Sequence, residues 1–249
     1  MRWGDPSADY TMVAFHGITS NGGAMSEPAR LLADRGWYVL AADMRGHGES
    51  GRGNGDFSFG TLLNDLAEAL PTSPDILLGH SFGGTLAQIA VLEDIFKPKS
   101  LILEDPVSVF EDKETPRAML DWDEANLPTT IEGLLSINPG WSPLDAAWKL
   151  LSIQQVAFDD ARSAFVGNAP WDLRSEASRL SSKIPTVWVL PDKSRFVPSE
   201  DLERLKSDTP KGSLAIFNEA GHSIHRDETE AFVDIVEQLA KGKWFDEQQ

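Results

Sequence analysis

Ser81 stands in a sequence context that could make its hydroxyl a nucleophile. It lies within Asp75–Gly84, DILLGHSFGG, where an apolar run predicted to be a strand meets a helical pattern at G-H-S-F-G. A G-x-S-x-G pattern between a strand and a helix is typical of the sharp turn that exposes a nucleophilic serine. The N-terminus of the following helix would favour negative charge near this serine. We therefore expect Ser81 to attack a carbonyl carbon.

Five histidines could supply the general base that takes the serine proton. His222 lies in the segment N-E-A-G-H, between the last predicted strand and the last predicted helix. Loops that follow parallel strands meet at one edge of the sheet, so His222 is predicted to reach Ser81 and to act as the base. We interpret three others as structural: His47, His80 and His225.

Two backbone amides are predicted to form an oxyanion hole. The segment Phe15–Thr19, FHGIT, ends the first clear strand, and Gly17 would let the chain turn close to the nucleophile. The N–H groups of Ile18 and Phe82 would then point at the oxygen on which negative charge develops.

The elements that must position these residues alternate along the chain. Short apolar runs predict strands at Thr11–Phe15, Trp37–Ala42, Ile76–Gly79, Ser100–Leu103, Thr186–Leu190 and Ser213–Phe217. Helical patterns lie at Ser26–Arg35, Ser58–Leu70, Phe82–Leu92, Ser199–Lys206 and His225–Lys241. This alternation is typical of an α/β fold, with a mostly parallel sheet covered by helices on both faces.

Residues 107–182 break the alternation. The segment shows no convincing strand, only helical patterns interrupted by prolines. We expect it to be a helical cap inserted into a core formed by residues 1–106 and 183–249. Four tryptophans of this segment either hold the cap to the core or line an apolar roof over the substrate, which would favour longer acyl groups. We predict substrate binding for all four: Trp122, Trp141, Trp148 and Trp171.

Taken together, these segments resemble the α/β-hydrolase superfamily. The motifs are HGIT near residue 16, DMRGHGES at 43–50, GHSFGG at 79–84 and AGH at 220–222, and they span nearly the whole chain. The resemblance implies the α/β-hydrolase fold with an inserted helical cap. It says less about the substrate, because this fold hosts many chemistries. A serine at the elbow, in place of aspartate, argues against the dehalogenase and epoxide-hydrolase branches.

The sequence departs from the family pattern in two places. Only ten residues precede the strand at Thr11, so the N-terminal hairpin strands are expected to be truncated, leaving six parallel strands. The usual acid position, four residues before Pro198, holds Ser194, which cannot supply the negative charge that stabilises an imidazolium.

The triad acid must therefore come from another position. Asp105 ends the strand 100–103 in L-E-D-P, beside the elbow and where water would be excluded, and it is the predicted acid. Asp192, two residues before the usual position, is the alternative, and Glu104 is a weaker one. The remaining alternative is that the protein has no functional triad acid.

The amino-acid composition limits which kinds of binding partner are expected. The 249 residues carry 22 Lys and Arg against 39 Asp and Glu, a net charge of −17, which argues against nucleic acid and anionic membrane surfaces. No residue is a cysteine, which excludes thiolate metal sites and cysteine nucleophiles. Because no signal peptide or membrane-spanning run is evident, we expect a cytoplasmic protein. The oligomeric state is left open.

The sequence thus predicts serine-dependent hydrolysis of a small carboxylic ester or lactone through an acyl-enzyme, with no metal and no cofactor. Two alternatives remain at this stage. One is C–C bond hydrolysis or cofactor-free oxygenation on the same fold. The other is a ligand-binding pseudo-hydrolase.

Overall fold

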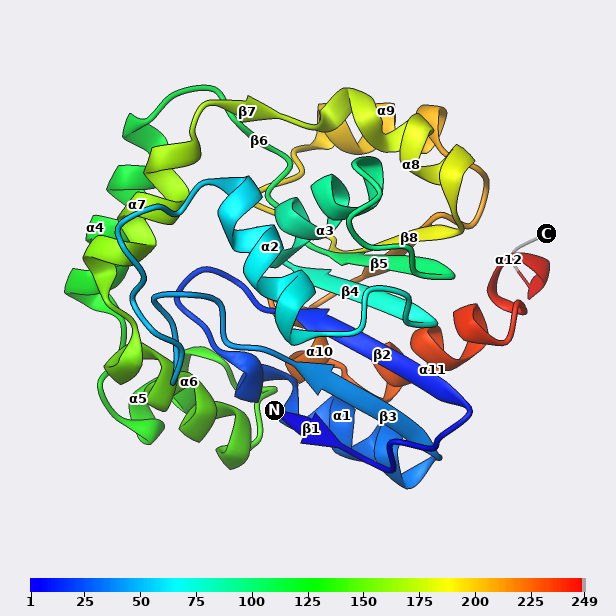
Figure 1. The fold of residues 1–249 in the computed structure, drawn as a ribbon, viewed down its shortest axis with the longest axis horizontal. Coiled ribbons are helices and arrows are strands. Elements are labelled where there is room, and N and C mark those ends of the chain that lie inside the picture. Colours follow the sequence, from blue (N-terminus) through cyan, green and yellow to red (C-terminus); the bar gives the residue numbers. More distant parts are fainter. Residues whose placement is uncertain (248–249) are drawn as a thin grey trace.

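The computed structural model describes residues 1–247 and is built around one large sheet (Figure 1). Its strands are β1 (Arg2–Trp3), β2 (Tyr10–Phe15), β3 (Trp37–Ala41), β4 (Ile76–His80), β5 (Ser100–Glu104), β8 (Thr186–Pro191) and β9 (Leu214–Phe217). They lie in the order β1–β3–β2–β4–β5–β8–β9. Only the two-residue β1 pairs antiparallel, with β3. The predicted parallel sheet and all six predicted strands are confirmed.

Helices cover both faces of this sheet (Figure 1). One face packs against α2, α3 and α8, and the other against α1 and α11. The helices before residue 107 and after residue 172 are α1 (Ser26–Asp34), α2 (Phe59–Ala69), α3 (Phe82–Leu92), α8 (Ala177–Lys183), α9 (Ser199–Asp208), α10 (Ile224–Asp227), α11 (Thr229–Ala240) and α12 (Trp244–Glu247). Two short 3₁₀ helices add to these, at Gly22–Met25 and Arg174–Glu176.

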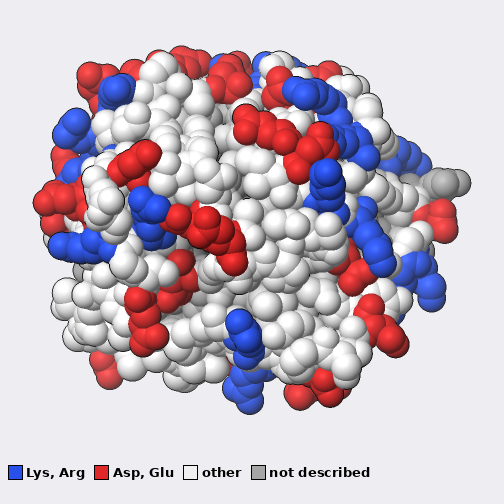
Figure 2. Space-filling view, viewed as in Figure 1, with Lys and Arg blue, Asp and Glu red and all other residues white. Residues whose placement is uncertain are grey.

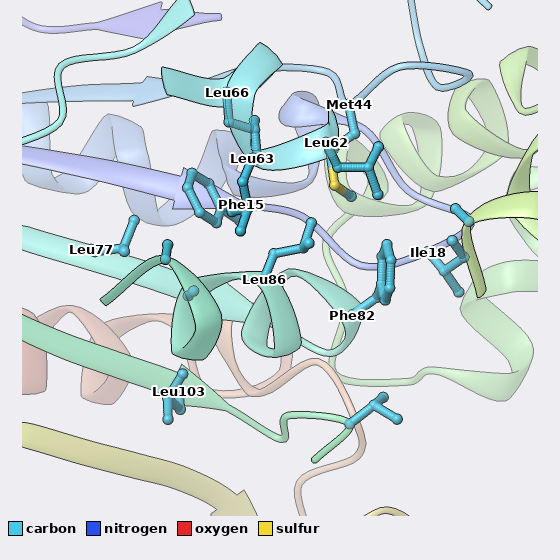
Figure 3. Close-up of a cluster of buried hydrophobic side chains, with 14 of the residues drawn as sticks. Phe15, Ile18, Met44, Leu62, Leu63, Leu66, Leu77, Phe82, Leu86 and Leu103 are labelled. Carbon is cyan, nitrogen blue, oxygen red and sulfur yellow. The ribbon is translucent and has the colours of Figure 1, made fainter. Parts of the chain in front are cut away.

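The strands are apolar along their whole length because both of their faces are buried. In β2, Val13 and Phe15 join the cluster under α2 and α3, whereas Met12 and Ala14 join the cluster on the opposite face. Figure 3 shows the first cluster, in which Phe15 lies among leucines of α2, α3 and β4. Each fully buried side chain of this size contributes about 1.5–3 kcal/mol of burial free energy, so the layer holds the end of β4 firmly in place.

Four helices lie between Phe110 and Trp171 in the chain, at the end of the sheet toward which the strand arrows point (Figure 1). They are α4 (Glu114–Asn126), α5 (Ile131–Ile137), α6 (Pro143–Gln155) and α7 (Phe158–Asn168). A two-stranded ribbon, β6 (Val109–Phe110) with β7 (Trp171–Asp172), joins the two ends of this segment. The ribbon corrects the expectation of no strand in this segment. The division of the chain into core and cap at 107–182 stays a prediction.

The last predicted helix, His225–Lys241, is two helices in the structure. The chain leaves helical geometry at Glu228, with φ −134° and ψ 51°, between α10 and α11. The two helices contact different parts of the molecule. His225 binds a carboxylate of β5, whereas α11 packs its apolar side on the sheet.

Acidic and basic side chains are interspersed over the face of the molecule drawn in Figure 2. Within the residues that the structure describes, none of the helices combines the length and the apolar character that crossing a membrane requires.

Candidate active site

Ser81 lies between β4 and α3 with backbone angles of φ 54° and ψ −120°, a strained conformation for a residue with a side chain. The glycines around it make this turn possible. A Cβ at Gly79 would lie 2.5 Å from the Gly83 carbonyl oxygen, and one at Gly83 would lie 2.2 Å from the Phe15 carbonyl oxygen. The turn therefore carries its serine at the carboxyl end of β4, as the motif predicts.

His222 and Asp105 are in direct contact. Nδ1 of His222 lies 2.6 Å from Oδ2 of Asp105, whose side chain is 1% exposed. The other carboxylate oxygen of Asp105 accepts a hydrogen bond from the hydroxyl of Ser194. That hydroxyl also accepts the backbone N–H groups of Phe196 (3.0 Å) and Val197 (2.8 Å). Ser194 thus holds the carboxylate that contacts the histidine, a role that the sequence analysis missed.

The other two candidate acids lie elsewhere. Asp192 is exposed at the end of β8. Glu104 is fully buried, but both of its oxygens lie 2.8 Å from Nδ1 of His225, and one also accepts the His225 backbone N–H. Of the three carboxylates, only Asp105 reaches His222.

The loop that carries His222 is fixed by contacts on both sides. His80 Nε2 lies 2.9 Å from the His222 carbonyl oxygen, and because a carbonyl only accepts, this ring nitrogen carries the proton. Asp227 accepts the N–H of Gly221 at 2.8 Å. Burial lowers the pKa of His80 well below its usual range, so the ring is a neutral donor. His80 thereby positions the backbone of His222.

His225 and Glu104 form a buried pair beneath this loop. Burial raises the pKa of Glu104 and lowers that of His225, so both groups favour their neutral forms. His80, Glu104 and His225 bring metal-ligating atoms within 4.8 Å of one another. The hydrogen bonds given above already occupy atoms of all three side chains, which accounts for the cluster without an ion.

One of the two predicted oxyanion amides belongs to a residue that lines the cavity of Ser81 and His222, and the other follows Ser81 directly in the chain. Ile18 lines the cavity, and Phe82 is the first residue of α3, where a backbone N–H has no acceptor within the helix. A Cβ at Gly17 would lie 3.1 Å from Cβ of Ser81, so glycine permits this close approach. Lys149 donates to the carbonyl and hydroxyl oxygens of Thr19, at 2.7 and 3.0 Å, and thereby ties the loop after Ile18 to α6.

This cavity has a volume of about 300 Å³ and is not the apolar chamber that the sequence suggested. It is lined by apolar side chains such as Met119, Leu127 and Leu134, but also by five charged ones. The charged side chains are Asp123, Lys149, Arg195, Arg226 and Asp227. None of these was singled out from the sequence, because they come from separate segments of the chain that no shared motif connects.

The predicted roles of the four tryptophans need correction. Only Trp141 lines the cavity. Trp122 is 60% exposed on the outside of α4. Trp148 packs on Gly23, and Trp171 is buried among phenylalanines with its indole N–H donating to the Val107 carbonyl at 3.1 Å. The last two attach the inserted segment to the core, because their rings find apolar partners there.

Comparison with known proteins identifies the family of this chain. Residues 12–235 match the sequence profile of the family described as "Alpha/beta hydrolase family". The chain belongs to the alpha/beta hydrolase family. The AB hydrolase superfamily protein YisY of Bacillus subtilis is 24% identical over 248 residues, covering 93% of this chain and 91% of that protein.

Two solved hydrolases share the fold. An esterase from Exiguobacterium antarcticum superposes with a TM-score of 0.76 at 20% identity, covering 97% of this chain and 94% of that one. The enol-lactonase from Burkholderia xenovorans LB400 gives 0.74 at 16% identity, covering 97% and 95%. These two similarities establish the fold, and the substrate must be argued from the site.

Proposed function

We propose that this protein hydrolyses a small carboxylic ester or lactone through an acyl-enzyme formed on Ser81. The observation that carries the proposal is the 2.6 Å contact of His222 with the buried carboxylate of Asp105, beside a cavity that Ser81 also lines. An esterase and a lactonase among the proteins of similar fold support the substrate class.

In the first half-reaction, Oγ of Ser81 attacks the carbonyl carbon while Nε2 of His222 takes the hydroxyl proton. The charge on the imidazolium is stabilised by Asp105 at Nδ1. The negative charge that develops on the carbonyl oxygen is met by the N–H groups of Ile18 and Phe82. His222 then gives its proton to the departing alkoxide oxygen, which leaves as an alcohol, or stays on the same molecule for a lactone.

In the second half-reaction, water attacks the acyl-Ser81 carbonyl and His222 removes a water proton. Collapse of the tetrahedral intermediate returns this proton to Oγ of Ser81 and releases the carboxylic acid. Both steps require His222 to hold its orientation. The contacts of Asp105 at Nδ1 and of His80 at the backbone carbonyl provide this restraint.

Labelling by a fluorophosphonate probe, with hydrolysis of 4-nitrophenyl esters and lactones, tests the proposal. The unmodified protein should label rapidly, and Ser81→Ala should abolish labelling and lower turnover by about 10⁶-fold. Ser223→Ala is the matched control, because Ser223 lines the same cavity away from the elbow and should leave labelling intact. Substantial turnover in folded Ser81→Ala protein would refute the serine mechanism. Absent labelling with tight ligand binding would favour a binding protein.

A further inference from the structure

Arg226 is an arginine inside the cavity without a hydrogen-bond partner. Its side chain is 4% exposed, yet it lines the cavity that Ser81 and His222 border. Among the described residues, none accepts a hydrogen bond from its guanidinium, and Nε is buried without an acceptor. The closest carboxylate contact joins Nε to Oδ1 of Asp145 at 3.9 Å, and this oxygen is also unpartnered.

Such a group is costly to bury unless something pairs with it. A guanidinium carries five N–H donors, and each one withdrawn from water without an acceptor destabilises the folded state. The Trp141 ring, 4.4 Å from the guanidinium carbon, covers one face of Arg226. A cation–π contact leaves the N–H donors at the edge of the guanidinium plane unsatisfied. Packing of the inserted helices against α10 therefore accounts for the position of Arg226 but not for its free donors.

The charges around the cavity favour an anionic occupant. Lys149, Arg195 and Arg226 contribute three cations against the carboxyl groups of Asp123 and Asp227. Burial and, after it, the charge of Arg226 together lower the pKa of Lys149 to about 8. Burial raises the pKa of Asp123 and of Asp227, which reduces the negative charge that these two residues set against the cations. An incoming carboxylate would relieve the repulsion between the buried cations.

We propose that Arg226, stacked on Trp141, binds a carboxylate that the substrate carries in addition to its scissile ester or lactone. A planar carboxylate accepts two parallel N–H bonds from a guanidinium, which Arg226 has free. The assignment names the substrate class of the site and rests on the proposed function for the hydrolytic step. The acid released from the acyl-enzyme would then be a dicarboxylate when the extra carboxylate is on the acyl side.

The test compares mono(4-nitrophenyl) esters of adipic and suberic acid with the same esters capped by a methyl group at the free acid. The free acids should have a kcat/KM about tenfold or more above that of the capped esters, because a hydrogen bond to a charged group contributes a factor of this size. In Arg226→Gln the ratio should fall toward one. Arg195→Gln is the matched control: Arg195 also borders the cavity but is exposed, so water screens its charge, and the ratio should change by less than about threefold.

Binding of adipate and suberate to Ser81→Ala protein, measured by calorimetry, separates this proposal from the hydrolytic one. Arg226-dependent binding without hydrolysis of any ester would uphold the carboxylate site and refute the esterase function. Hydrolysis of free and capped esters at equal rates would refute the carboxylate site and uphold the esterase function. If no ester is hydrolysed and neither diacid binds, both fail. If Arg226→Gln does not fold, the ratio of kcat/KM for free and capped esters in the unmodified protein still tests the carboxylate site.

Discussion

Replacing Asp105 by asparagine removes one charge from the proposed triad and changes almost nothing in shape. The carboxylate is 1% exposed, with one oxygen 2.6 Å from His222 Nδ1 and the other bonded to the Ser194 hydroxyl. An amide fits the same space, and its NH₂ group would face His222 or Ser194. If it faces His222, Nδ1 becomes an acceptor and the proton moves to Nε2, the atom that must take the proton of Ser81.

The size of the effect follows from the charge separation. Unit charges 2.6 Å apart attract by about 6 kcal/mol at an effective dielectric constant of about 20, an upper value because both charges are delocalised. Neutralising a triad acid typically lowers kcat by about 10³–10⁴-fold, which is about 4–5.5 kcal/mol of transition-state stabilisation. We expect Asp105→Asn to fall in this range.

Steady-state hydrolysis of a 4-nitrophenyl ester at saturating concentration is the assay, with thermal melting to verify folding. Asp192→Asn is the matched control, because Asp192 is exposed and should lose tenfold or less. If Asp192→Asn loses more activity than Asp105→Asn, the assignment of the acid is refuted.

Three further predictions concern groups around the site. Ser194→Ala removes a hydrogen bond to the Asp105 carboxylate and should lower kcat about tenfold or more. Ser194→Asp should not raise kcat, because it places a second carboxylate beside that of Asp105. A large gain in kcat from Ser194→Asp would refute Asp105 as the acid. Lys149→Met should stabilise the fold at pH 7, because a pKa of about 8 in the folded state against 10.5 costs about 3 kcal/mol below pH 8. That penalty fades as the pH rises from 8 toward 10.5, so a melting-temperature difference that is equal at pH 7 and pH 10 would contradict the prediction. Glu104→Ala leaves the buried N–H groups of His225 without their acceptor, and because each such donor costs about 1–3 kcal/mol, the free energy of unfolding in urea should fall by about 3 kcal/mol. An unchanged midpoint would show that the pair contributes nothing.

The turn at Ser81 was predictable because its causes are local. Gly79 and Gly83 lie so close to backbone atoms of adjoining elements that no side chain fits. The five-residue G-x-S-x-G pattern contains both of these glycines, so it predicts the turn. The six parallel strands were predictable for a related reason. Burial on both faces makes each strand a short apolar run, and the intervening helices show one-sided patterns.

Shorter elements were set by tertiary contacts. Each strand of the β6–β7 ribbon has two residues, too few for any periodic pattern, and the two are paired across the whole inserted segment. The break at Glu228 separates α10, tied to β5 through Glu104, from α11, packed on the sheet. The apolar spacing that predicted the helix runs from Ala231 to Leu239, entirely within α11, so it carried no signal of the break before α11.

The contents of the site were decided only by the tertiary structure. Asp105 and Asp192 both follow strands, and the sequence favoured Asp105 but kept Asp192 as an alternative, because it does not show which carboxylate points at the His222 loop. Trp141 and Trp122 are alike in type, yet one lines the cavity and the other is exposed. Local sterics can be written in a few neighbouring residues, whereas a cavity is lined by side chains from distant segments, whose directions depend on how the elements pack.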